Sequence, residues 1–173
     1  LTPAAYTQTS CGAVVPDLAA AEATIDYLLD GSEFTIGWYY DAEYTDPYVS
    51  GSLIRTVLNP CETQTITLYA QAVCFDGALF DAGSMDVVLY PTPQAPAVVR
   101  NDFFCSYSII PGCDDDTVAP ATLPNESPGA AESIVSLTVT TADGCSQIFD
   151  VTKPNCPICE LEFDIAFDYT VDN

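Results

Sequence analysis

The segment Thr63-Gln64-Thr65-Ile66-Thr67-Leu68-Tyr69-Ala70-Gln71-Ala72-Val73-Cys74 alternates between two kinds of side chain over its whole length. Neighbouring side chains of a β-strand point to opposite faces of the sheet, so this period of two residues predicts a strand with one inward face. The inward face carries Ile66, Leu68, Ala70, Ala72 and Cys74, and the outer face carries Thr65, Thr67, Tyr69, Gln71 and Val73.

Further segments rich in β-branched and aromatic residues lie on both sides of this strand, separated by turn residues. They cover 33–40, 86–90, 98–99, 103–110, 133–141 and 147–152, and a long loop is expected over 111–129. Residues 18–29 predict one helix with Asp17 as its N-cap, although 24–28 also suits a strand. Short strands at this spacing are typical of an all-β fold built from β-sandwiches.

The proline-rich stretch Pro91-Thr92-Pro93-Gln94-Ala95-Pro96 divides the chain. Proline cannot continue a hydrogen-bonded ladder, and such stretches form stiff, extended linkers. We therefore expect one small β-sandwich over 1–90, a linker over 91–96, a second β-sandwich over 97–156 and a separate C-terminal strand over 157–173.

The composition excludes several classes of function. The 173 residues hold 25 Asp and Glu, 3 Lys and Arg and no His, for a net charge of −22, yet 49% are hydrophobic. This hydrophobic content excludes a disordered chain, and the negative field excludes binding to nucleic acid or to anionic membrane surfaces. No apolar run approaches the roughly 20 residues that a membrane helix needs, which excludes membrane insertion. The absence of His, the commonest general base, argues against an enzyme.

Eight cysteines without any histidine predict disulfide bonds and an oxidising, extracellular location. They are Cys11, Cys61, Cys74, Cys105, Cys113, Cys145, Cys156 and Cys159. A strand over 63–74 holds Cys61 and Cys74 much farther apart than the ~7 Å that a disulfide spans, so Cys74 is expected to bond elsewhere, and Cys11 is the other cysteine that precedes it. Cys156-Pro157-Ile158-Cys159 has the spacing of a thiol-exchange motif, but the β-patterned acidic segment after it favours structural disulfides. The connectivity stays open.

Four stretches together resemble an immunoglobulin-like repeat of the large secreted surface proteins and adhesins of gliding bacteria. They are Phe34–Ala42 with its Trp-Tyr pair, Leu68–Cys74, Val87–Pro93 with its Pro-Thr-Pro end, and Leu137–Thr152. The resemblance implies immunoglobulin-like β-sandwiches in a non-catalytic extracellular module used for display, adhesion or fibre building. It also implies that Trp38 packs against an inter-sheet disulfide.

The C-terminus carries the most regular pattern in the chain. Large apolar residues alternate there with mostly acidic ones, and the apolar set is Leu161, Phe163, Ile165, Phe167, Tyr169 and Val171. One interpretation is the last strand of the second domain. The other is a strand donated to the next copy, in which main-chain hydrogen bonds supply affinity and alternate side chains fill a groove.

The loop over 111–129 holds several candidate sites. Asp114, Asp115 and Asp116 offer oxygen ligands to Ca²⁺, but they lack the spacing of an EF-hand, so we expect a solvated acidic loop and no cofactor. Asn125-Glu126-Ser127 matches the N-glycosylation triplet. Asp116-Thr117-Val118 resembles the Asp-Thr-aliphatic O-glycosylation site of secreted proteins in the same bacterial group, with Thr117 as the modified residue. An unmodified loop is the alternative for both. Elsewhere, the tyrosines at 39, 40, 44 and 48 are candidates for stacking on sugar rings, with packing as the alternative.

The sequence therefore predicts a non-enzymatic extracellular structural protein, a bacterial surface fibre subunit that joins copies of itself head to tail by strand donation. The alternative is a monomeric adhesin module that binds carbohydrate, such as surface glycans, or protein. A secreted hydrolase accessory domain is a third possibility.

Overall fold

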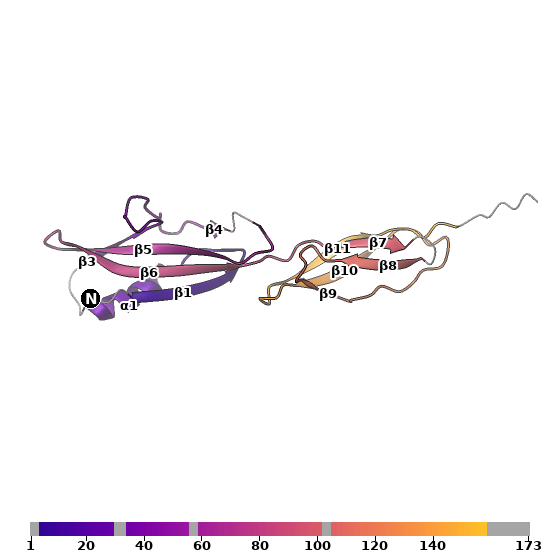
Figure 1. The fold of residues 1–173 in the computed structure, drawn as a ribbon, viewed down its shortest axis with the longest axis horizontal. Helices are drawn as coiled ribbons and strands as arrows, with labels where there is room; N and C mark the ends of the chain where they lie inside the picture. Colours follow the sequence, from indigo (N-terminus) through magenta and orange to yellow (C-terminus); the bar gives the residue numbers. More distant parts are fainter. Residues whose placement is uncertain (1–3, 30–33, 56–58, 102–104, 159–173) are drawn as a thin grey trace, which may run out of the picture.

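The computed structural model describes residues 4–29, 34–55, 59–101 and 105–158, which form two β-domains joined end to end (Figure 1). The elements of the first domain are β1 (Ala4–Cys11), β2 (Ala13–Val14), α1 (Leu18–Leu29), β3 (Phe34–Tyr39), β4 (Ile54–Arg55), β5 (Gln64–Cys74) and β6 (Leu79–Tyr90). Those of the second domain are β7 (Ala97–Asn101), β8 (Ser106–Ile110), β9 (Thr117–Ala119), β10 (Ser133–Thr140) and β11 (Ser146–Lys153). The predicted all-β class with disulfides is confirmed, because strands are the main elements of both domains and α1 is the one helix among the described residues.

The first domain is built on a four-stranded sheet in the order β1-β6-β5-β3. The central strands β5 and β6 are antiparallel, whereas β1 runs parallel to β6 from Ala4 opposite Gly83 to Cys11 opposite Tyr90. One face of the sheet is buried, including Leu68, Ala70 and Ala72 at 0% exposure, which confirms the inward face predicted for 63–74.

Helix α1 packs against this sheet. Its predicted N-cap is confirmed, because the backbone N–H of Ala20 donates to Oδ1 of Asp17 at 3.1 Å. Ala21 and Ile25, four residues apart and so on one face of the helix, belong to the buried core.

Trp38 lies in the same core, and its Nε1 donates to Glu22 of α1 at 3.0 Å. The expectation that Trp38 packs against an inter-sheet disulfide is wrong: each disulfide among the described residues includes at least one cysteine of the second domain. The polar partner of the Trp38 indole is Glu22 of helix α1, and no disulfide lies within the first domain among the described residues.

The second domain combines a three-stranded sheet, β11-β10-β9, with the β7–β8 hairpin. Strands β10 and β11 pair antiparallel around the turn at residues 141–145, as the sequence predicts, and Leu137 and Val139 of β10 are fully buried. The expected loop over 111–129 contains β9, which pairs with the end of β10. The loop prediction is wrong at those three residues.

Residues 91–96 connect β6 to β7 without helix or strand. Within the described ranges, no helix is both long and apolar enough to cross a membrane. The apolar C-terminal pattern from Leu161 to Val171 lies outside the described residues.

Candidate functional site

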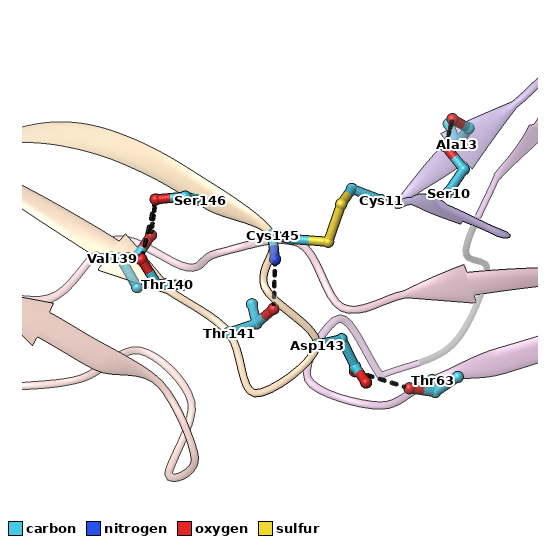
Figure 2. The surroundings of a disulfide bond; sticks show 10 residues. All are labelled: Ser10, Cys11, Ala13, Thr63, Val139, Thr140, Thr141, Asp143, Cys145 and Ser146. Carbon is cyan, nitrogen blue, oxygen red and sulfur yellow. Dashed lines mark hydrogen bonds between the residues drawn. A yellow bond between two sulfur atoms is a disulfide. The ribbon is translucent and has the colours of Figure 1, made fainter.

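The junction between the two domains gathers the most unusual features of this chain. Strands β1 and β6 run in parallel and both end at the junction, and the turn between β10 and β11 meets them from the other side (Figure 1). Cys11, the last residue of β1, is bonded to Cys145 in that turn, with a Cα–Cα distance of 5.9 Å (Figure 2). The two partners are 134 residues apart in sequence.

A second disulfide crosses the same junction. Cys61, just before β5, is bonded to Cys113, in the loop after β8, with a Cα–Cα distance of 5.6 Å. The domains are therefore joined by three covalent connections, two disulfides and the 91–96 linker. A single flexible linker permits relative domain motion, whereas these additional connections restrict it.

The linker itself is packed against both domains. Pro91, Pro93 and Pro96 are buried, and proline already restricts the backbone. A side chain at Gly12 of the first domain would place its Cβ 2.2 Å from Cγ2 of Thr92, and Gly12 also has a positive φ of 71°.

Gly112 of the second domain makes the same kind of close approach. A Cβ there would lie 2.5 Å from Cβ of Gln94 and 2.9 Å from its carbonyl carbon. Both glycines are thus required for the close approach of each domain to the linker.

Hydrogen bonds accompany these covalent links. Thr63 Oγ1 of the first domain donates to Oδ2 of Asp143 in the second at 3.2 Å (Figure 2). The turn that carries Asp143 is itself held in shape, because the backbone N–H of Cys145 donates to Thr141 Oγ1 at 3.2 Å and that of Gly144 to the carbonyl of Thr141 at 3.0 Å.

An acidic cleft of about 510 Å³ opens at the junction. Five carboxylates from both domains line it: Glu62, Asp114, Asp115, Asp116 and Asp143. Asp114 and Asp115 are exposed, but Asp116 is only 8% exposed, so the expectation of a wholly solvated acidic loop is wrong at this residue. No group of three or more His, Cys, Asp or Glu side chains in the described residues is arranged to hold a metal ion.

The sequence singled out three of these five acids and missed Glu62 and Asp143. A signal was present, since Glu62 directly follows Cys61 and Asp143 lies two residues before Cys145. Using it requires the disulfide pairing, because the pairing is what brings these segments together.

The remaining cysteines differ in whether they form a disulfide. Cys105 is bonded to Cys156 within the second domain. Cys11 is bonded to Cys145, so a pairing of Cys74 with Cys11 is wrong, and Cys74 is bonded to no described cysteine. Cys159 lies outside them.

The opposite end of the first domain forms an apolar tip. We define the distal tip as the β5–β6 turn with Phe75, Leu79 and Phe80, which are 92%, 61% and 42% exposed. A hollow of about 270 Å³ beside it is lined by Phe34, Thr35, Val73, Cys74 and Phe75. Because β6 runs from this tip to the junction, the tip faces away from the second domain (Figure 1).

The four candidate sugar-binding tyrosines pack against one another. Tyr39 and Tyr44 meet edge to face at 5.5 Å between ring centroids, and Tyr40 and Tyr48 do so at 5.6 Å. Tyr48 is buried, its hydroxyl donates to the carbonyl of Ser52, and burial raises its pKa. This geometry is that of packing.

The two candidate glycosylation residues are exposed. Thr117 lies in β9 and its hydroxyl donates to the carbonyl of Thr140 at 3.1 Å, while Asn125 lies in the loop before β10. Modification of either residue stays a prediction.

No family model and no curated protein match the sequence. Among solved structures, a structure of the fibronectin(III)-like modules of Clostridium thermocellum CbhA matches with 14% identity over 96% of this chain and 97% of that chain, at a TM-score of 0.27. At this TM-score the two backbones do not superpose closely.

Proposed function

We propose that this chain is a non-enzymatic extracellular structural protein, a rigid rod that joins copies of itself head to tail into a bacterial surface fibre. The observation that carries the proposal is the pair of disulfides, Cys11–Cys145 and Cys61–Cys113, that lock two β-domains end to end. Disulfides persist in oxidising compartments, which fits a secreted protein. A subunit without a free hinge suits a long, straight assembly.

The polarity of the rod supports a head-to-tail arrangement. Strand β11 begins next to Cys145 at the junction and runs away from it, so Ile158, which follows, is at the end of the second domain remote from the first. The distal tip is at the other end of the molecule. Residues 159–173 therefore continue from one end of a subunit whose opposite end is apolar and exposed.

The composition of the C-terminal segment supports strand donation. In the sequence, large apolar residues alternate with mostly acidic ones, a period of two that would place them on one face of an extended segment; they are Leu161, Phe163, Ile165, Phe167, Tyr169 and Val171. Burying such side chains contributes about 1.5–3 kcal/mol each, so six together contribute about 9–18 kcal/mol, which is enough to offset an association cost of about 4–15 kcal/mol over most of that range. Head-to-tail contacts that do not close into a ring produce filaments.

The acceptor that we propose is the distal tip of the next copy. The hollow at Phe34 and Cys74 and the exposed Phe75, Leu79 and Phe80 supply apolar contacts there. Strand β3, at the edge of its sheet, supplies a strand edge next to the same hollow.

Mixing two defective subunits tests this function. The first lacks residues 161–173 and keeps its tip, and the second keeps its tail but carries Phe75→Asp and Leu79→Asp. We expect filaments of the intact chain in electron micrographs, monomers of either variant alone, and one-to-one dimers on mixing, measured by analytical ultracentrifugation. Asp164→Asn with Asp168→Asn, on the polar face, is the matched control and should still assemble.

Monomeric intact chain at high concentration, or unchanged assembly after the deletion, would contradict strand donation. Circular dichroism of each variant distinguishes loss of assembly from loss of folding. The adhesin alternative receives no support from the tyrosines, which pack in pairs within the first domain.

A further inference from the structure

Asp116 is a buried carboxylate with an unused oxygen. Its side chain is 8% exposed, it lines the acidic cleft, and its Oδ2 is inaccessible to solvent with no hydrogen-bond partner. Burying an ionised carboxylate is costly unless a partner compensates it. One residue of the cleft lining therefore has a carboxylate oxygen that no group of the described protein partners.

No positive side chain lines the cleft. The three basic residues of the chain, Arg55, Arg100 and Lys153, are all absent from its lining. Lys153 is paired with Glu126, and Arg100 donates to the carbonyl of Asn155, both in the second domain. Five carboxylate residues thus line the cleft, and no protein cation is among its lining residues.

The donors present are hard oxygens. The two sulfur atoms at the cleft belong to the Cys61–Cys113 disulfide, so they supply no thiolate, and the chain has no His. Oxygen-only sites suit Ca²⁺, which accepts six to eight ligands from carboxylates, carbonyls and water in flexible geometry.

From Asp116 and this donor set we propose that the junction cleft binds a calcium ion, with the Asp116 carboxylate as a ligand. Side chains alone form no three-ligand cage in the described residues, so water and main-chain or hydroxyl oxygens complete the shell. Glu62 comes from the first domain and Asp114, Asp115 and Asp143 from the second. The ion therefore neutralises charge on both sides of the junction. This inference is independent of fibre assembly.

Calorimetric titration of the full, oxidised chain with CaCl₂ tests the site. We expect saturable binding to one site, and a loss in affinity of about tenfold or more in Asp116→Asn. Asp46→Asn removes the same charge from an exposed turn outside the cleft and should bind as the intact chain does. MgCl₂ serves as the probe for selectivity, and NaCl at matched ionic strength controls for screening.

Thermal unfolding provides the second measurement. CaCl₂ should raise the midpoint of the intact chain and of Asp46→Asn above that in matched NaCl, and EDTA should reverse the shift. Absence of saturable binding, equal affinity in Asp116→Asn, or equal stabilisation by matched NaCl would overturn the proposal. If Asp116→Asn does not fold, Asp143→Asn replaces it under the same criteria.

Discussion

Cys11 and Cys145 lie 5.9 Å apart at their Cα atoms although 134 residues separate them, and their disulfide fixes the end of strand β1 to the turn between β10 and β11. Together with Cys61–Cys113 it makes the two domains one covalent unit. The properties of the junction can be tested one element at a time.

Removing the first interdomain disulfide should lower stability and loosen the rod. The double variant Cys11→Ala/Cys145→Ala is expected to lose about 2–4 kcal/mol in the free energy of unfolding, measured in urea. Its X-ray scattering should indicate a broader range of interdomain distances. Cys105→Ala/Cys156→Ala is the control, because that bond lies within one domain. It should lose stability without changing the shape, and an unchanged shape in both would contradict a locked junction.

Replacing Gly12 with alanine should strain the junction. The new Cβ would meet Thr92 at 2.2 Å, and φ is 71°. Gly77→Ala provides the matched control, because its φ is 82° but nothing lies within 4 Å of the added atom. We expect a loss of about 1–2 kcal/mol for Gly77→Ala from conformation alone. Gly12→Ala should lose about 1–3 kcal/mol more from the clash, measured by chemical denaturation. Equal losses would show that the linker moves aside freely.

The buried lysine of the second domain should be costly to replace. Lys153 is 4% exposed, forms an ion pair with Glu126 and lies 5.0 Å from the centre of the Tyr107 ring. Lys153→Met leaves Glu126 unpaired, and we expect a loss of about 2–3 kcal/mol because Glu126 remains partly exposed. Glu126→Gln in the same chain should recover part of it. A double-mutant cycle by urea unfolding measures the coupling, and a value near zero would contradict the pairing.

Asp41 should contribute a pH-dependent part of stability. The backbone N–H of Thr45, the hydroxyl of Thr45 and the backbone N–H of Asp46 donate to its carboxylate, which lowers its pKa below the ordinary 3.8. A pKa lowered by folding means that the stabilisation is full above about pH 3.8 and is lost as the pH falls through the lower folded value.

The difference in unfolding free energy between the intact chain and Asp41→Asn should therefore be constant near neutral pH and shrink in acid. Denaturant unfolding between pH 7 and pH 2.5 measures it. Glu43→Gln removes one charge from the same turn without removing these hydrogen bonds. A difference that stays constant down to the lowest pH would contradict the role of the carboxylate.

The pattern of apolar and polar residues along the chain predicted those helices and strands that form because of their own residue order. The strict alternation of 63–74 and the capped apolar face of 18–29 both correspond to observed elements, β5 and α1. Strand β1 was missed, because Ala4–Cys11 is mostly small and polar and becomes a strand through its parallel pairing with β6. Strand β9 was missed for a similar reason, since its three residues are ordered by pairing with β10.

The candidate site was less predictable than the fold. Eight cysteines allow 105 pairings, and the observed one depends on which ends of the two domains meet. The cleft adds Glu62 and Asp143, 81 positions apart in the chain, to the acidic run at 114–116. Periodicity reports burial within an element, and it carries no information on how separate domains approach each other.

The Cys11–Cys145 bond also determines how the molecule carries a mechanical load. Tension applied to the chain before Cys11 and after Cys145 passes directly from one sulfur to the other, and everything between the two cysteines is bypassed. Helix α1, β2 to β10 and the proline linker cannot be pulled out in sequence while this bond is intact. The described parts left to extend are β1 and the stretch from β11 to Ile158, so a strained molecule would lengthen by little before a covalent bond bore the force.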